Sequence, residues 1–386
     1  MRRSPCSETL TQGRPGASPS LAARQLPCRD APCRLLAAMA ARVAVLTPFA
    51  SPSVRGNAIT VDRIAHGLRR RGVELRVWDL SVVPEGAVEH QITQYGPAVI
   101  HAFHAFRTGP TALRLARRAG VPLLVTVTGT DVNQDLVDQD AEPIVRRVLE
   151  GAGAVSVFDE SMAALITQAL PATAGRLVVI PQSAIFEVPA SGHWPPIAAL
   201  QRLPGPIFLF PAGIRKVKRP AFPLEPLDRL RDRYATLELV YVGPIIDAAE
   251  GESLRRLLSG YPWARYLGAV PHNRMPELLE LSDVVLNCSL SEGGMANSVL
   301  EALSLGRAVL AADIAGNRSL VEDAITGFLF GSAEELAAKA DRLLQDPDLR
   351  ARLGVAGRER VNARFGADRE TDGYLAAYMR LAPGLG

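Results

Sequence analysis

The chain has 386 residues, of which 48% are hydrophobic and 22% are charged, and its formal net charge at pH 7 is +3. A chain of this length is expected to form two or three domains, and its composition excludes intrinsic disorder or a fibrous architecture for most of the sequence. It contains no run of about 18 apolar residues, which excludes a membrane-spanning helix.

The positive charge is concentrated at the N-terminus. Residues 1–38 sum to +4, and the remaining 348 residues sum to about −1. The net charge therefore does not point to a nucleic-acid partner. Residues 1–38 are rich in Arg, Ser, Pro and Ala and have no hydrophobic period, so we interpret them as a disordered extension, or as a misplaced start if translation begins at Met39. A transit peptide is the alternative interpretation.

Three of the four cysteines also lie in this N-terminal segment, and the body of the chain contains only Cys288. One cysteine cannot form a disulfide within the body, which is typical of a reducing compartment, and we expect a cytoplasmic protein. Cys28 and Cys33 lack the second pair of ligands that a zinc motif requires.

From residue 42 onward, short apolar runs alternate with amphipathic stretches. This alternation predicts parallel sheets that are covered by helices on both faces. In the first half, strands are predicted at 42–46, 75–80, 98–103, 123–128, 154–158 and 177–180, and helices at 60–71, 110–118, 142–150 and 161–169. In the second half, strands are predicted at 207–210, 237–242, 264–267, 284–287, 308–311 and 328–330, and helices at 222–232, 253–258, 274–281, 298–305, 333–344, 347–363 and 368–381.

A Pro-rich stretch, residues 187–206, separates the two halves and predicts a linker. The expected fold class is therefore α/β, with two doubly wound, Rossmann-like domains in series. Sheets of this kind bind ligands at the carboxyl ends of their strands, so we expect a ligand in the cleft between the two domains.

Several chemistries that are common on such folds lack their motifs here. The loop after the first strand, TPFASPSVRGNAIT, has no GxGxxG fingerprint, which argues against a nicotinamide dehydrogenase. The sequence also contains no GxxxxGK[ST] loop and no HExxH motif. Asp138 and Asp140 form a DxD pair, but they precede a predicted helix, where acidic residues are common. We therefore expect no bound metal.

The segment SLSEGGMANSVLEALSLG follows a predicted strand. Gly293 and Gly294 come after Glu292 in a tight loop, where the absence of side chains lets backbone N–H groups approach a ligand. The helix that begins near Asn297 favours an anion at its N-terminus. Glu301, about one turn into that helix, could accept hydrogen bonds from two hydroxyls, as on a ribose. The alternative for Glu301 is a solvated helix residue.

A second informative segment, PAGIRKVKRP, directly follows the first strand of the second half. Arg215 and Lys218 are expected to project from this strand end into the cleft. Such a cationic pair can neutralise the charge that develops on a leaving diphosphate without a metal ion. The alternative for either residue is a solvated surface position. Together, the two segments point to a ligand with a ribose and a diphosphate.

With these segments, the sequence resembles the group 1 (family 4) retaining glycosyltransferases of the GT-B fold over residues 42–382. The matching features include VGP after a strand, YLGAVPHNRMPELL and ITGFLF. Within that family, the motifs GNAIT, HAFRTG, GTDVNQD and GIRKVK resemble the glycosyltransferase 1 domain-containing proteins. The selenosugar synthases share the GN-x-x-T and TGTD patterns.

This resemblance implies transfer of a hexosyl group from a nucleotide sugar, with a UDP-sugar as the expected donor and co-substrate. It implies retention of the anomeric configuration, and no cofactor or metal. The final helix is expected to cross back onto the first domain. The domains are then residues 39–190 with about 366–386, a linker at 191–205, and a nucleotide-sugar-binding domain at 206–365.

The resemblance also implies roles for individual residues. The diphosphate would be held by Arg215 and Lys218, and from the opposite side by Gly56 and Asn57. The sugar or phosphate would be contacted by backbone N–H groups of Gly293, Gly294 and Met295, and the sugar hydroxyls by Glu292. Glu301 would bind the ribose, the backbone near Val270 would meet the base, and Asn297 would stand at the start of the donor-binding helix. Arg215 and Lys218 would then act in catalysis.

The sequence departs from the usual pattern of this family in three places, one of which is the shorter spacing between Arg215 and Lys218. Many members carry a His after the fourth strand, in a pattern like T-x-H-G, where this sequence has Thr128. His104, after the third strand, heads a matched motif and is the candidate catalytic histidine, with a packing role as the alternative. Glu292 and Glu301 are nine residues apart, one more than usual, which leaves the role of Glu292 open.

The acceptor is expected against the first domain, facing the loops after its first, third and fourth strands. Those loops offer Arg55, Asn57, His104, Arg107, Thr130 and Asp131. Two guanidiniums and an imidazole suit a small polar acceptor, which can be anionic because Arg binds phosphate or carboxylate bidentately. A membrane lipid is the rival acceptor, through the basic cluster at 69–71. Peripheral membrane contact is not favoured, because these arginines end a predicted helix, where cations complement the dipole.

Two other functions compete with the transferase. A nucleotide-sugar epimerase of the same architecture would need acid–base carboxylates around the sugar ring, and the first domain shows no such cluster in its sequence. A catalytically silent nucleotide-sugar-binding protein would also retain Arg215, Lys218 and Glu301. The sequence identifies neither the sugar, nor the acceptor, nor the oligomeric state.

Overall fold

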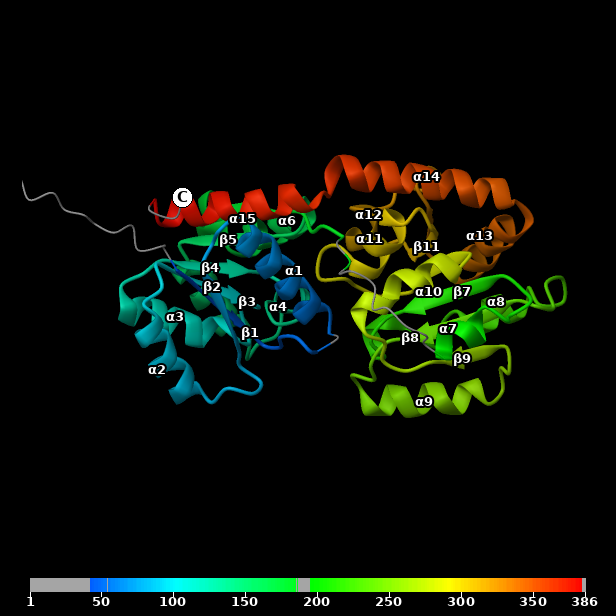
Figure 1. Ribbon diagram of the computed structural model, residues 1–386, viewed down its shortest axis with the longest axis horizontal. Helices are drawn as coiled ribbons and strands as arrows, with labels where there is room; N and C mark the ends of the chain where they lie inside the picture. Colours follow the sequence, from blue (N-terminus) through cyan, green and yellow to red (C-terminus); the bar gives the residue numbers. More distant parts are fainter. Residues whose placement is uncertain (1–41, 54, 185, 187–194, 384–386) are drawn as a thin grey trace, which may run out of the picture. The chain divides into compact units, whose positions relative to one another are not determined.

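Two parallel six-stranded sheets, each flanked by helices, make up the part of the chain that the structure describes (Figure 1). The structure is a computed structural model, and the described residues are 42–53, 55–184, 186 and 195–383. The predictions for residues 1–38 and for the start of the linker lie outside these residues. Within the rest of the predicted linker, Pro195–Leu200 forms a short helix, α7. The two sheets confirm the predicted α/β, doubly wound fold class.

The first sheet is built from short apolar strands. They are β1 (Val43–Thr47), β2 (Leu75–Asp79), β3 (Val99–Phe103), β4 (Leu123–Thr126), β5 (Ala154–Val157) and β6 (Leu177–Val179). They pair in parallel in the order β2-β1-β3-β4-β5-β6, with Val43 opposite Leu75 on one side and Val99 on the other. Every residue of β1, β3, β4 and β5 is buried. This burial explains why these strands are continuous apolar runs in the sequence.

Most helices of the first half lie within a few residues of their predicted positions. They are α1 (Gly56–Arg70), α2 (Glu85–Tyr95), α3 (Gly109–Ala119), α4 (Thr130–Asn133), α5 (Glu142–Gly151) and α6 (Glu160–Ala169), followed by the 3-10 helix η1 (Pro171–Arg176). The sequence pattern does not predict α2. This helix buries two residues, Val88 and Ile92, which are too few to give an apolar face that the sequence pattern would reveal.

Helices cover both faces of the first sheet, because successive strand residues point to opposite sides. On one face, Val45 of β1 shares a buried cluster with Tyr374 of the final helix, α15 (Ala367–Leu381). On the other face, Leu46 shares a cluster with Ile92 of α2. Figure 1 shows α15 returning along the first sheet next to α1.

A buried ion pair fixes the final helix on α1. Arg63 donates from Nε and Nη2 to the Glu370 carboxylate, both at 2.9 Å, and Ser183 Oγ donates to the same carboxylate at 2.6 Å. The C-terminal helix thus packs with elements of the first half, as a discontinuous first domain requires. The domain boundaries themselves stay a prediction.

The second sheet has the same design. Its strands are β7 (Ile207–Pro211), β8 (Glu238–Val242), β9 (Ala264–Tyr266), β10 (Val284–Asn287), β11 (Ala308–Ala312) and β12 (Phe328–Phe330), in the order β12-β11-β10-β7-β8-β9. Its helices are α8 (Leu224–Asp228), α9 (Ala248–Leu258), α10 (Met275–Leu281), α11 (Asn297–Ser304), α12 (Ala315–Arg318), α13 (Ala333–Gln345) and α14 (Pro347–Arg364), with the 3-10 turns η2 (Lys216–Lys218) and η3 (His272–Arg274). The helix predicted at 222–232 is shortened to α8, which begins directly after Pro223 and ends at Asp228.

The strand order reverses once in each sheet, between β1 and β3 and between β7 and β10. Doubly wound sheets bind their ligands beyond the carboxyl ends of the strands at such a reversal. The loops at these ends follow Thr47, Phe103, Pro211 and Asn287. They carry most of the residues that the sequence pattern singles out.

His101, on β3, is a buried titratable group that does not belong to these loops. Its ring nitrogens lie 2.7 Å from Tyr378 Oη and 2.7 Å from Thr126 Oγ1. Burial lowers the pKa of His101 from 6.5 to about 3. The folded protein therefore keeps this ring neutral at pH 5, where the unfolded chain protonates it. Its contribution to stability is complete above pH 6.5 and is lost as the pH falls toward 3.

Acidification from pH 7 to pH 5 is therefore expected to lower the free energy of unfolding by about 2 kcal/mol through His101 alone. Urea unfolding at pH 7 and pH 5 measures the decrease in the free energy of unfolding. In His101→Gln this decrease should be smaller by about 2 kcal/mol. The control is His90→Gln, because His90 is exposed. An equal pH dependence in His101→Gln and the parent protein would contradict the prediction.

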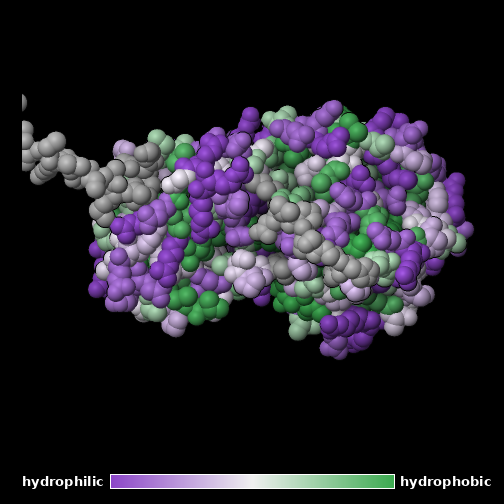
Figure 2. Space-filling view, viewed as in Figure 1, coloured by the Kyte–Doolittle hydropathy of each residue, from purple (hydrophilic) through white to green (hydrophobic). Residues whose placement is uncertain are grey.

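None of the helices in the part of the chain that the structure describes is long and apolar enough to cross a membrane. Hydrophilic side chains cover the outward face of α9, at the lower right of Figure 2. The same residues contain no group of three or more His, Cys, Asp or Glu side chains that could hold a metal ion.

Candidate functional site

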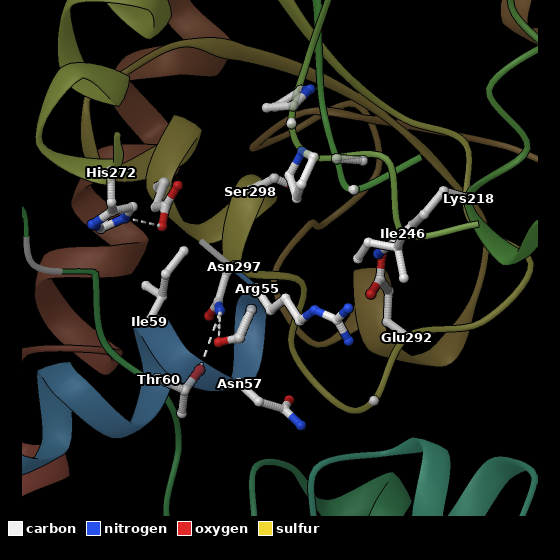
Figure 3. Close-up of a pocket in the computed structure, with 18 of the residues that line it drawn as sticks. Arg55, Asn57, Ile59, Thr60, Lys218, Ile246, His272, Glu292, Asn297 and Ser298 are labelled. Atoms are coloured by element: carbon white, nitrogen blue, oxygen red, sulfur yellow. Dashed lines mark hydrogen bonds and ion pairs between the residues drawn. The ribbon is translucent and has the colours of Figure 1, made fainter. Parts of the chain in front are cut away.

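A pocket lies where the loops after β1, β7 and β10 meet, and residues of both halves of the chain line it (Figure 3). We call it the donor pocket. The sequence-predicted residues that line it are Gly56, Asn57, Arg215, Lys218, Val270, Glu292, Gly293, Asn297 and Glu301. The fold thus gathers positions that are up to 245 residues apart in the sequence.

Lys218 and Glu292 form an ion pair on one side of the donor pocket. Lys218 Nζ donates to Glu292 Oε1 at 2.5 Å, and Asn287 Nδ2 and Ser289 Oγ donate to the same oxygen at 2.9 and 2.6 Å. Burial alone would raise the pKa of Glu292, but Lys218 and these hydrogen bonds hold it below its ordinary value. Glu292 is therefore ionised, and its Oε2 makes no hydrogen bond to the described residues.

Arg215 differs from Lys218, because its charge is not balanced by an ion pair with any described carboxylate. Its Nε is buried without a hydrogen-bond partner among the described residues. Burial lowers the pKa of Arg215, and repulsion from Arg107 and Arg55 adds to the effect, while Glu292 opposes it. An arginine stays protonated under such a shift, so the pocket holds a half-buried positive charge that is free to act on an anion.

Glu301 faces the opposite side of the donor pocket, and its side chain is 9% exposed. Its Oε1 lies 2.8 Å from Nε2 of His272, which follows β9, and the His272 ring stacks on Phe186. Figure 3 shows His272 at the far side from Lys218. The alternative of a solvated helix residue is therefore wrong for Glu301, because a neighbouring ring orients its carboxylate.

Asn297, at the start of α11, connects the two halves. Its Nδ2 donates to Thr60 Oγ1 at 3.2 Å and to the Gly56 carbonyl at 3.5 Å, both in α1 (Figure 3). Its Oδ1 is buried without a partner among the described residues. The N-terminus of α11 and an unpartnered amide oxygen thus lie together beside the pocket.

The loops after β4 and β10 touch through their glycines. A Cβ atom built on Gly129 would lie 1.6 Å from Gly293 Cα, and one built on Gly293 would lie 2.0 Å from the Thr128 carbonyl oxygen. Asn133 Nδ2, in the same first-half loop, donates to the Glu292 carbonyl at 2.8 Å. This approach is possible only without side chains at both positions, and it brings Thr128 next to the Glu292 loop.

A second pocket adjoins the first and lies against the loops after β1, β3 and β4; we call it the acceptor pocket. Its lining includes the predicted residues Arg107, Thr130 and His104. Arg55 lines both pockets, and in Figure 3 its guanidinium points toward the side where Lys218 and Glu292 lie.

His104 lines the acceptor pocket with a side chain that is only 1% exposed. Its φ of +80° is rare for a residue with a Cβ. Burial lowers its pKa, so the ring is neutral at pH 7. Nδ1 accepts the Arg107 backbone N–H at 3.3 Å, so Nε2 carries the hydrogen and donates to Thr130 Oγ1 at 3.2 Å. Both nitrogens are thus engaged, and His104 positions Arg107 and Thr130; its catalytic role stays a prediction.

Asp131 does not face the acceptor pocket as predicted. It is fully buried, and its carboxylate accepts backbone N–H groups of Ala105, Thr128 and Gly129 at 2.8, 3.0 and 2.6 Å. A carboxylate that is held by three backbone donors shapes the loop and has no free face for an acceptor. This finding corrects the prediction.

Gly294 and Met295 also lie outside both pockets. Gly294 has a φ of +105°, and a side chain there would collide with Met162 and Phe158. Met295 is 5% exposed, and its sulfur accepts the Gln182 backbone N–H at 3.3 Å. Both residues pack against the first half, so the predicted donor contact is left to Gly293.

The structure adds pocket residues that sequence reasoning did not single out. They include Phe49, Thr60, Asn133 and His272. Thr60 lies in GNAIT and Asn133 lies in GTDVNQD, and both motifs belong to the family resemblance. The motifs could therefore have predicted these two residues as part of the site. Phe49 lies in an irregular loop, and His272 begins η3 within the motif YLGAVPHNRMPELL, but only the fold reveals what their rings contact.

Comparison with known proteins gives a consistent result. Residues 31–182 match the family described as "Glycosyl transferase 4-like domain", and residues 205–346 match "Glycosyl transferases group 1". The chain is similar to glycosyltransferase 1 domain-containing protein 1 of Xenopus tropicalis, with 24% identity over 331 residues that cover 84% of this chain and 94% of that protein.

Solved structures have the same arrangement of elements. HepE of Anabaena in complex with UDP-glucose has a TM-score of 0.74 and 16% identity, covering 88% of this chain and all of that one. Sucrose-phosphate synthase of Thermosynechococcus elongatus has a TM-score of 0.74 and 20% identity, covering 88% of this chain and 99% of that one. At these identities, the likeness to solved structures establishes the fold alone.

Proposed function

We propose that this chain, which belongs to the group 1 glycosyltransferases and has the GT-B fold, transfers a sugar from a nucleoside diphosphate sugar to a small polar acceptor. We infer retention of the anomeric configuration, as is typical of the family. The observation that carries this proposal is the half-buried Arg215 guanidinium, which has no carboxylate partner among the described residues and lies in a pocket that also contains the N-terminus of α11.

The donor-side roles follow from the charges. A leaving diphosphate gains negative charge as the bond to the sugar breaks, and a preorganised guanidinium stabilises that charge. Arg215 can do so directly. Lys218 is engaged by Glu292, so we assign it a shared role: it contributes charge to the diphosphate while keeping Glu292 ionised. Backbone N–H groups at Gly293 and at the start of α11 complete the anion site.

The remaining donor contacts are assigned by position. Glu301, which His272 orients, is proposed to accept ribose hydroxyls. Glu292 Oε2 is proposed to accept a sugar hydroxyl, and the backbone near Val270 to meet the base. Gly56 and Asn57 would close on the diphosphate from α1. A UDP-hexose is the proposed donor, because HepE, a structure with this fold, was solved with UDP-glucose.

Mass spectrometry of reactions with a panel of nucleotide sugars and polar acceptors tests the proposal. The expected result is a new glycoside together with free nucleoside diphosphate, and NMR of the product gives its anomeric configuration. An isomerised donor would instead identify an epimerase. A donor that binds but stays unchanged with every acceptor would identify a binding protein.

A further inference from the structure

Three guanidiniums, those of Arg55, Arg107 and Arg215, converge on the acceptor pocket. The Arg55 guanidinium carbon lies 4.0 Å from the centroid of the Phe49 ring, and that of Arg107 lies 6.0 Å from the same centroid. One aromatic ring thus holds two arginine side chains at the pocket wall through cation–π contact.

The three arginines of this pocket lack carboxylate ion-pair partners among the described residues, although Asp135 lies near enough to Arg107 to interact with it electrostatically. Glu292, the carboxylate that lines the pocket, is paired with Lys218. Arginines elsewhere differ: Arg114, for example, binds both Glu85 and Glu89. Like charges that converge without partners destabilise the empty site, which is the arrangement of an anion-binding site.

The donor diphosphate accounts for only part of this charge. Arg215 lines the donor pocket, and Arg55 lines both pockets. Arg107 lines the acceptor pocket and not the donor pocket. Its backbone N–H donates to His104 Nδ1 at 3.3 Å, which fixes the residue in the loop after β3. A second anionic group is therefore needed to complement Arg107.

We propose that the acceptor is a small anion that carries a phosphate or carboxylate group, which binds to Arg107 and Arg55 over Phe49, and that its hydroxyl is the nucleophile. This inference rests on the proposed transferase function. The acceptor oxygen forms the new bond to the anomeric carbon, and the bond from that carbon to the diphosphate breaks with its electron pair on the diphosphate. The hydroxyl proton passes to a diphosphate oxygen. Thr130 Oγ1, which accepts from His104, keeps its own hydrogen to orient the acceptor.

A binding experiment tests the anion site without requiring turnover. Calorimetric titration of inorganic phosphate, and separately of acetate, is performed with UDP saturating the donor pocket. Arg107→Gln is expected to weaken binding of at least one of these anions by about tenfold or more, the scale of a charge-assisted hydrogen bond, and to leave UDP affinity unchanged. The control is Arg117→Gln, on the exposed face of α3. Equal anion binding by Arg107→Gln and the parent protein would overturn the inference.

A kinetic experiment separates this inference from the proposed function. Matched acceptors are compared: glycerol with glycerol 3-phosphate and with glycerate, and glucose with glucose 6-phosphate. The anionic member of a pair is expected to have at least tenfold higher kcat/KM, and Arg107→Gln should remove the preference by raising the acceptor KM. Faster transfer to the neutral members would overturn the inference and leave the transferase standing. Failure of UDP to bind, or isomerisation of the donor, would overturn both.

Discussion

Arg215→Ala is expected to lower kcat by about 100-fold or more, which is the effect of losing one preorganised donor to a developing charge. The guanidinium lies in the donor pocket and has a buried Nε without a partner among the described residues. Its removal leaves no protein carboxylate unpaired, because Arg215 forms no ion pair with the described residues. The variant should therefore fold normally, and steady-state kinetics with a UDP-sugar measure the loss.

Lys218→Ala is expected to lose turnover on the same scale by a different route. It removes a cation from the donor pocket and also leaves Glu292 buried without its ion pair. Lys216→Ala is the matched control, because Lys216 is an exposed cation in the same 3-10 turn. Near-normal turnover in both Arg215→Ala and Lys218→Ala would contradict the assignment of the diphosphate site.

The sequence predicts the sheets well because burial on both faces makes their strands continuous apolar runs. The strands predicted at 284–287 and 328–330 coincide with β10 and β12, whose residues are all buried. Prediction fails where packing is local or weak. Helix α2 buries too few residues to show a period, and α4 is a single turn whose loop is shaped by Asp131.

The candidate site could be predicted in part for a similar reason. Arg215 and Lys218 lie in a motif directly after a strand, and Glu301 lies early in the helix that follows another strand. The topology therefore predicts that all three lie at the carboxyl ends of the strands. Contacts between segments do not follow from such motifs. The sequence gives no sign that His272 orients Glu301, nor that the carboxylate of Asp131 turns inward to three backbone N–H groups.

The contact between the glycine loops is a structural feature with a large expected effect on activity. A Cβ on Gly293 would lie 2.0 Å from the Thr128 carbonyl oxygen and 2.8 Å from Gly129 Cα, where ordinary contacts are 3.4–4 Å. Both obstacles are backbone atoms, so the loops after β4 and β10 must separate by more than about 1 Å to accept a methyl group. The same displacement moves Glu292 and the start of α11 away from the first half.

Gly293→Ala is therefore expected to lower kcat by about 100-fold, because a displacement of about 1 Å between reacting groups has an effect of that size. Gly293 does not have a positive φ, so alanine suits its backbone and the loss would come from the contact itself. Kinetics and urea unfolding are measured together, with Gly175→Ala as the control, since a Cβ there meets nothing within 4 Å. Because a separated pair of loops still folds within each half, turnover should fall much more than stability. A Gly293→Ala protein with kcat within a few-fold of the parent would show that the two loops need not touch when the sugar is transferred.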